Sequence, residues 1–142
     1  FAKDWIDDDI LPARAQVVIT NEIPDLKIKG TFHYEKGYYY FRNVGKRILL
    51  GGGRNLDIEG ETTEEFGLSH QIQSKLKELL ENVILPNDSF EIEDSWSGIM
   101  GVGKSKSPII KKINNNTAVG VRMGGMGVAI GSQVGKKLAD LF

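Results

Sequence analysis

The chain has 142 residues, of which 40% are hydrophobic, and its formal net charge is −1. This length supports one domain with its own core, and the near-neutral charge favours neither nucleic acid nor an anionic membrane as a partner. Without cysteine, the chain has no disulfides, thiolate metal sites or cysteine nucleophiles, and two histidines are too few for a zinc site. The apolar stretch 119–134 contains Arg122 and many glycines, so it predicts no membrane span; without a signal-peptide pattern, we expect a cytoplasmic protein.

The first half of the chain predicts short strands joined by turns. The acidic run Asp7–Asp9 is interpreted as a solvated turn, with metal binding as the weaker alternative. Residues 38–42 and 47–50 are rich in aromatic and β-branched residues and flank the turn-forming sequence Asn-Val-Gly-Lys, so they predict a hairpin. The predicted strands of this half are 13–20, 30–34, 38–42 and 47–50.

The second half adds two helices. An apolar stripe at helical spacing begins after Ser69 and ends before Pro86, and it comprises Ile72, Leu76, Leu79, Leu80 and Val83. A second helix is predicted from Val128 to Leu141. Further strands are predicted at 90–93, 108–113 and 117–122. This order predicts the α+β class: a single domain over residues 1–142, with a mainly antiparallel sheet, a mid-chain helix and a C-terminal helix.

The glycine turn between the last strand and the last helix is the most informative motif. It reads Gly-Gly-Met-Gly over residues 124–127. Gly127, Gly131 and Gly135 are spaced four apart, which places them on one face of the helix. Because each interior glycine weakens a helix, the pattern indicates close approach of another backbone or of a ligand. Free N–H groups at the helix start favour an electron-rich ligand atom.

A second motif matches a nucleotide-binding pattern. Residues 98–105, Gly-Ile-Met-Gly-Val-Gly-Lys-Ser, satisfy the P-loop pattern, in which Lys104 would contact phosphates and Ser105 would bind Mg²⁺. A P-loop requires a helix that starts at the lysine, whereas Pro108 and a β-like sequence follow. We therefore interpret the segment as a flexible, basic connection between strands, and a P-loop nucleotide hydrolase as the less favoured alternative.

Four segments, in order, resemble the C-terminal portion of the D-amino-acid oxidase/glycine oxidase-like family of FAD-dependent oxidoreductases. They are similar to the family's Pro-x-Arg-Gly-Gln strand, its tyrosine-bearing hairpin that ends in Gly-Gly, its Trp-x-Gly…Pro-Ile stretch and its final glycine turn. The segments are residues 12–17, residues 38–42 with 47–52, residues 96–98 with 108–110, and residues 122–129.

The resemblance implies an enzyme that takes hydride from a carbon beside an amine and transfers it to FAD. In this family the final glycine turn presents backbone N–H groups to the flavin's pyrimidine end and ribityl chain. The resemblance therefore implies cofactor contacts at Gly124, Gly125, Met126, Gly127 and Val128. Tight packing of helix on sheet, without a cofactor, is the alternative interpretation of this segment.

The family's dinucleotide fingerprint, G-x-G-x-x-G after a first strand, is absent from this sequence. We therefore expect a fragment whose N-terminal FAD-binding part is missing, which also fits a sequence that begins with Phe1 rather than Met. The fragment alone should bind FAD poorly or not at all, and the missing part is its expected partner. Apolar surface left exposed by that part could also pair two fragments as a dimer.

The resemblance also implies substrate-side residues, while the catalytic residues stay unknown. Met100 stands where amino-acid oxidases carry the arginine that grips the substrate carboxylate, so Arg42, Arg122 or Lys104 takes that role or the substrate is not an amino acid. The family's usual turn histidine is Met123 here. Tyr40 is a candidate to cover the substrate or to pack in the sheet, and Trp96 is a core residue, a flavin-side wall or a substrate contact.

The sequence leaves three points open. A stand-alone α+β module that binds a protein partner through its glycine helix is the alternative to the oxidoreductase. The substrate, an amine or an amino acid, is not identified by any motif. Oxidase and dehydrogenase activity are not distinguished either, because both begin with hydride transfer to flavin.

Overall fold

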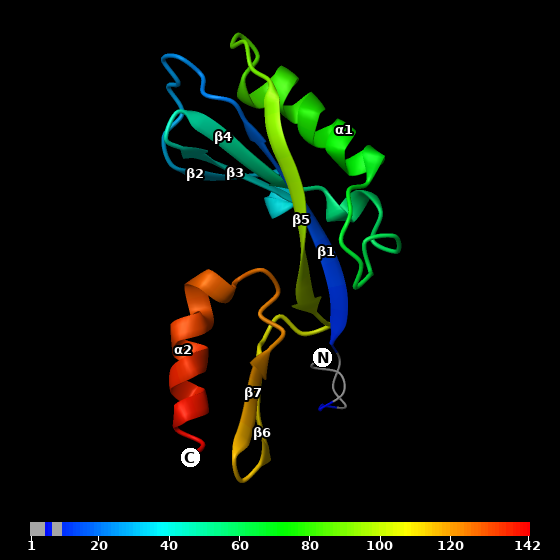
Figure 1. The fold of residues 1–142 in the computed structure, drawn as a ribbon, viewed down its shortest axis with the longest axis vertical. Coiled ribbons are helices and arrows are strands. Elements are labelled where there is room, and N and C mark those ends of the chain that lie inside the picture. Colours follow the sequence, from blue (N-terminus) through cyan, green and yellow to red (C-terminus); the bar gives the residue numbers. More distant parts are fainter. Residues whose placement is uncertain (1–4, 7–9) are drawn as a thin grey trace. The chain divides into compact units, whose positions relative to one another are not determined.

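A computed structural model describes residues 5–6 and 10–142, so the predicted turn at Asp7–Asp9 lies outside the described residues (Figure 1). The chain divides into two compact units. The sheet unit comprises Arg14–Gly98, and the hairpin unit comprises Phe1–Ala13 with Ile99–Phe142. The chain passes between the units within strand β1 (Leu11–Thr20) and again near the end of strand β5 (Ile92–Val102).

The larger sheet has five strands in the order β2-β3-β4-β1-β5. The predicted hairpin is confirmed: β3 pairs antiparallel with β4, with Phe41 opposite Leu50 and Tyr40 opposite Gly51. Strand β4 continues to Gly52, two residues beyond its predicted end. Strands β2 and β3 pair antiparallel, as do β1 and β4. The bounds are β2 (Thr31–Tyr34), β3 (Tyr39–Val44) and β4 (Arg47–Gly52), with short 3₁₀ turns η1 (Glu35–Gly37) and η2 (Arg54–Leu56).

The predicted mid-chain helix is α1 (His70–Leu79), which packs against the sheet and buries Ile72, Leu76 and Leu79 (Figure 1). A π-helix, η3 (Leu80–Ile84), follows without a break, and the N–H of Leu85 donates to the carbonyl of Leu80 at 2.8 Å. Strand and helix residues together form one core cluster in the sheet unit: Val18, Ile23, Tyr39, Ile48, Leu50, Ile72, Leu76, Leu79, Leu80, Ile84 and Leu85.

Strand β5 is longer than the sequence predicted, and this corrects the interpretation of the P-loop-like segment. Residues 98–102 belong to β5 rather than to a flexible connection, and the next element after Lys104 is strand β6 (Ile109–Asn114). Because no helix begins at Lys104 in the described chain, the amide arrangement of a P-loop is not formed. Only residues 103–108 connect β5 to β6.

The hairpin unit consists of β6 and β7 (Thr117–Val121), paired antiparallel, and helix α2 (Gly127–Ala139). Helix and hairpin approach closely at Gly120, where a Cβ atom would lie 2.6 Å from Val134 and 2.8 Å from Leu138. Cβ atoms at Gly131 and Gly135 would meet no described atom within 4 Å. Among the described residues, close packing of helix on hairpin is therefore found at Gly120 of β7 and not at the helix glycines, where the approach of a ligand stays a prediction. The α+β class with a mid-chain and a C-terminal helix is confirmed.

Candidate functional site

The glycine turn between β7 and α2 has an unusual backbone. Gly124 and Gly125 have φ values of 55° and 83°, in the left-handed region that glycine adopts freely. A Cβ atom on Gly125 would also lie only 3.1 Å from the sulfur of Met100. Both the conformation and the neighbouring thioether therefore favour glycine at residue 125.

The turn is anchored at alternate amides. The N–H of Gly124 donates to the carbonyl of Gly101 in β5 at 3.1 Å, and the N–H of Met126 donates to the carbonyl of Met123 at 2.8 Å. Three other amide N–H groups of the turn, those of Gly125, Gly127 and Val128, donate to no acceptor among the described residues. Since these amides stand at the start of α2, the positive end of the helix dipole, they form a donor set suited to an electron-rich acceptor.

Met100 is the substrate-side candidate that the structure brings to this turn. It is half-buried in β5, and its sulfur lies against Gly125. The carbonyl of the neighbouring residue, Gly101, accepts the hydrogen bond from Gly124. A Cβ atom on Gly101 would lie 3.5 Å from the backbone of Arg122, so β5 also packs closely against the segment before the turn. The end of β5 thus contacts the glycine turn through both a side chain and a backbone carbonyl.

The guanidinium of Arg122 contacts the backbone of the connection between β5 and β6. Its Nε and Nη2 atoms both donate to the carbonyl of Ser107, at 3.2 and 3.1 Å. Ser107 lies in the connection between β5 and β6. Arg122 therefore links that connection to the segment that directly precedes the glycine turn.

Tyr40 and Arg42 lie two residues apart on β3, so they share one face of the sheet, opposite the face on which Tyr39 is buried. The Tyr40 ring lies across Gly51, where a Cβ atom would be 2.5 Å from the Tyr40 hydroxyl oxygen. Tyr40 is still 37% exposed, so it packs on the sheet without being fully buried. Burial raises the pKa of that hydroxyl, which keeps it a hydrogen-bond donor at neutral pH.

Trp96, in β5, is 42% exposed, which excludes its interpretation as a core residue of the sheet unit. The flavin-side wall and the substrate contact stay as predictions. A Cβ atom on the nearby Gly98 would meet no described atom within 4 Å, so the Trp-x-Gly stretch presents open surface.

Sequence reasoning missed a buried polar network in the sheet unit. The Glu61 carboxylate, fully buried, accepts hydrogen bonds from Arg14 Nε at 3.0 Å, Arg14 Nη2 at 2.7 Å and Gln16 Nε2 at 2.9 Å. Gln16 Oε1 in turn accepts from the N–H of Ser69 and from Gln73 Nε2, each at 3.0 Å. Arg14 and Gln16 are the polar residues of the Pro-x-Arg-x-Gln segment, and in this structure they hold the 57–69 loop against β1. No signal in the sequence identified Glu61 as their partner.

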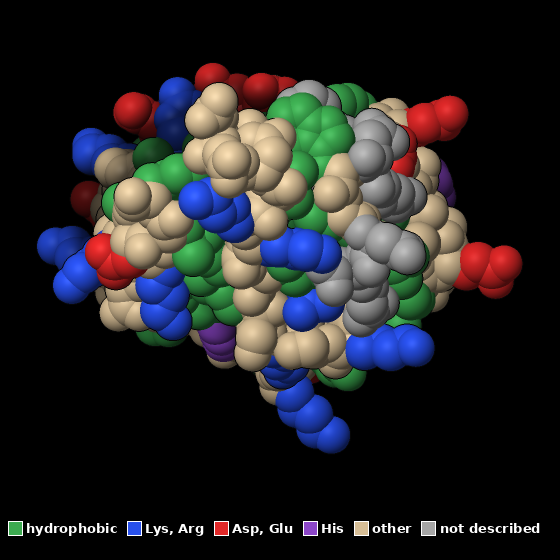
Figure 2. Space-filling view, turned by 90° about the horizontal axis from the view of Figure 1, so that it is seen from below, with side chains coloured by type: hydrophobic (Ala, Val, Ile, Leu, Met, Phe, Trp, Pro, Cys, Tyr) green, Lys and Arg blue, Asp and Glu red, His purple; other side chains and the backbone are tan. Residues whose placement is uncertain are grey.

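Charge is distributed unevenly along the chain. Residues 99–142 contain seven Lys or Arg residues and a single acid, Asp140. Lys and Arg side chains are spread over the face drawn in Figure 2, where acidic side chains are fewer. An electropositive surrounding favours a ligand with anionic groups.

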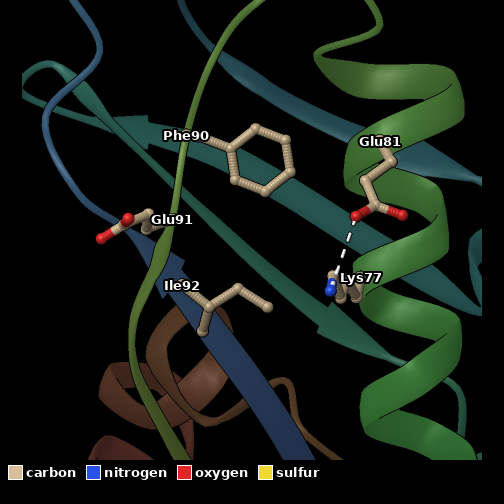
Figure 3. A pocket seen from close by; sticks show the side chains of 5 residues that line it. All are labelled: Lys77, Glu81, Phe90, Glu91 and Ile92. Atoms are coloured by element: carbon tan, nitrogen blue, oxygen red, sulfur yellow. Dashed lines mark ion pairs between the residues drawn. The ribbon is translucent and has the colours of Figure 1, made fainter.

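A cavity of about 320 Å³ lies elsewhere in the sheet unit, between α1 with η3 and the start of β5 (Figure 3). Phe90 and Ile92 form its apolar part, and the Lys77–Glu81 ion pair, 3.7 Å long, lies at its rim. It contains none of the predicted site residues. Among the described residues, no group of His, Cys, Asp or Glu is arranged to hold a metal ion, and no helix is long and apolar enough to cross a membrane.

Similar solved structures share this fold. An iminodiacetate oxidase from Chelativorans sp. BNC1 superposes with a TM-score of 0.73 at 16% identity, over 95% of this chain and 36% of its own. A glycine oxidase from Bacillus cereus superposes with a TM-score of 0.70 at 15% identity, over 93% of this chain and 36% of its own. An L-proline dehydrogenase from P. horikoshii superposes with a TM-score of 0.73 at 20% identity, over 93% of this chain and 35% of its own. The chain thus spans about a third of the length of each of these proteins.

The sequence comparisons bear on the family directly. No curated protein matches the sequence. The family model described as FAD dependent oxidoreductase (DAO) matches residues 2–141, nearly the whole chain. This chain therefore belongs to the DAO family of FAD-dependent oxidoreductases.

Proposed function

We propose that this chain is the substrate-side, flavin-capping part of an FAD-dependent oxidoreductase that oxidises an amine or an amino acid. An N-terminal part of the same polypeptide, with the dinucleotide-binding fingerprint, would supply the rest of the FAD site. The family match and the fold support the class of enzyme. The single observation that carries the finer proposal is the set of amides at Gly125, Gly127 and Val128, which donate to no acceptor among the described residues.

The residues of the turn fit the flavin's electron-rich pyrimidine end. The N–H groups of Gly125, Gly127 and Val128 would donate to its oxygen and nitrogen atoms, while those of Gly124 and Met126 hold the shape of the turn. FAD, when bound, would supply the hydride acceptor for the reaction. The helix dipole and the basic surroundings would stabilise negative charge on that ring.

The substrate class is inferred from the similar solved structures and from Met100. The similar structures include an iminodiacetate oxidase, a glycine oxidase and an L-amino acid deaminase from Proteus vulgaris, and amine-bearing acids are therefore the first compounds to assay. Met100 offers no charge for a carboxylate, so this chain would bind a carboxylate through another cation or would favour an amine without a carboxylate at that position.

The proposal is tested by purifying the full-length protein that contains this chain. We expect flavin absorbance, and we expect Gly127→Val to abolish it, because a side chain there would occupy the space of the ligand. A Cβ atom on Gly127 meets only the sulfur of Met123, at 3.8 Å, so the substitution is compatible with the fold. Gly135→Val, at a glycine of the same helix whose Cβ atom would meet no described atom within 4 Å, is the matched control and should retain flavin. A wild-type protein that purifies without flavin and cannot be reconstituted with FAD would refute the proposal.

A further inference from the structure

Arg122 has a backbone conformation that an L-residue with a side chain rarely adopts. Its φ is 60°, in the left-handed region, and it directly precedes a turn in which Gly124 and Gly125 share that region. Glycine would adopt this conformation at residue 122 without strain. The presence of arginine there indicates that its side chain has a role that offsets the strain.

The contacts of the guanidinium show what that role is. The β6–β7 ladder ends with Ile109 opposite Val121, so the next pair would be Pro108 opposite Arg122. Proline has no N–H group and cannot donate to the ladder. Beyond it, the Arg122 Nε and Nη2 atoms donate together to the carbonyl of Ser107, at 3.2 and 3.1 Å. The Arg122 side chain thus joins the end of β7 to the segment before β6, beyond the last backbone pair of the two strands.

This linkage fixes the start of the glycine turn from one side, and β5 fixes it from the other. Two residues after Arg122, the N–H of Gly124 donates to the carbonyl of Gly101. Between these two attachments the chain has little freedom to rotate, and the unpartnered amide of Gly125 follows immediately. The orientation of the donor amides therefore depends on the guanidinium of Arg122.

We propose that Arg122 is a positioning residue: by holding the Ser107 carbonyl, it sets the geometry of the glycine turn that donates to the flavin. This inference rests on the proposed function, and it replaces the prediction that Arg122 grips the substrate. It requires the planar fork of arginine, since lysine carries the same charge but only a single nitrogen.

The test uses the full-length flavoprotein and three variants, Arg122→Lys, Arg122→Gln and Arg122→Gly, with Lys106→Gln as the control. Lys106 is exposed in the same connection, and its substitution removes the same charge. We expect all three Arg122 variants to weaken flavin binding roughly tenfold, the effect of losing one charged hydrogen bond, and to lower the reduction potential of the bound flavin. The KM for substrate should change little.

A second measurement needs no flavin. Hydrogen exchange at the Gly124 amide should accelerate in Arg122→Gln and Arg122→Gly but not in Lys106→Gln. Arg122→Gly also relieves the backbone strain, so its thermal stability should equal or exceed that of Arg122→Gln. The reduction potential of its flavin should still fall. If the arginine had only a structural role, thermal stability and flavin potential would change together.

The results distinguish this inference from the proposed function. Wild-type protein without flavin would refute the proposed function itself. Wild-type protein with flavin, together with variants whose flavin affinity and potential are unchanged, would overturn the positioning role. A KM that rises steeply in Arg122→Gln and is rescued by Arg122→Lys would overturn it too, in favour of direct contact between Arg122 and an anionic substrate.

Discussion

Removing Arg14 should destabilise the chain far more than removing Arg14 and Glu61 together. Glu61 is fully buried, and its carboxylate has two hydrogen bonds from Arg14 and one from Gln16. Arg14→Met would leave a buried carboxylate with one neutral donor. Breaking one side of a buried ion pair costs about 3–5 kcal/mol, a large part of the 5–15 kcal/mol that typically stabilises a domain.

The double variant Arg14→Met, Glu61→Leu removes both charges at similar volume. Gln16 Nε2 then loses its partner, which costs about 1–3 kcal/mol. The Glu65 carbonyl, which accepts from Arg14 Nη1 at 3.4 Å, is exposed and binds water instead. The free energy of unfolding of the double variant should therefore lie closer to wild type than that of either single variant. The hydrogen bond to Glu61 raises the pKa of the Arg14 guanidinium, so Arg14 stays charged throughout the neutral pH range.

Urea unfolding followed by circular dichroism measures the effect. With a slope of about 1–3 kcal/mol per molar urea, the Arg14→Met midpoint should fall by roughly 1–5 M. Lys46→Met, at an exposed residue, is a charge-matched control that should unfold near the wild-type midpoint. An Arg14→Met variant that loses less than about 1 kcal/mol, or a double variant whose loss equals the sum of the two single losses, would refute the reasoning.

Further substitutions test the packing of each unit. In the hairpin unit, Gly120→Val should lower the free energy of unfolding by about 1–3 kcal/mol or more, because its Cβ atom would lie 2.6 Å from Val134. Gly135→Ala, in open space, should stabilise α2 by up to about 1 kcal/mol in thermal unfolding, and equal effects of the two substitutions would contradict this packing. The hydroxyl of Tyr39 is buried and has no hydrogen-bond partner among the described residues, so Tyr39→Phe should raise the free energy of unfolding by roughly 1 kcal/mol. Burial raises the pKa of Tyr39 in the folded state, so stability falls as pH rises through and above about 10, and Tyr39→Phe should reduce that fall while Tyr38→Phe, at an exposed ring, should not.

The elements were predictable where local patterns and burial agree. The hairpin at residues 38–50 combines β-rich segments with a turn sequence, and the mid-chain helix has an apolar stripe that the sheet covers. Strand β5 was underestimated because its C-terminal half, Gly98–Val102, contains two glycines and resembles a phosphate-binding loop. Its strand conformation depends on neighbours far away in the sequence, which a local pattern does not contain.

The candidate site was predictable as a segment but not as a set of atoms. The sequence identified the turn at 124–127 and the departure at Met100, and their contact is visible only in the structure. Which amides donate within the turn and which stay unpartnered depends on Gly101, in another strand. The role of Arg122 depends likewise on the carbonyl of Ser107, a backbone atom that no residue type reveals.

The π-helix after α1 has a consequence for comparing this chain with its relatives. A π-helical turn contains one residue more than the α-helical turn it replaces, and here that turn spans Leu80–Ile84. Relative to a family member with a regular helix at this place, every residue after the turn is displaced by one position until a gap restores the alignment. An alignment drawn without that gap would pair Ile84 and Leu85, both buried in this core, with residues that face solvent, and would misplace the start of β5 as well.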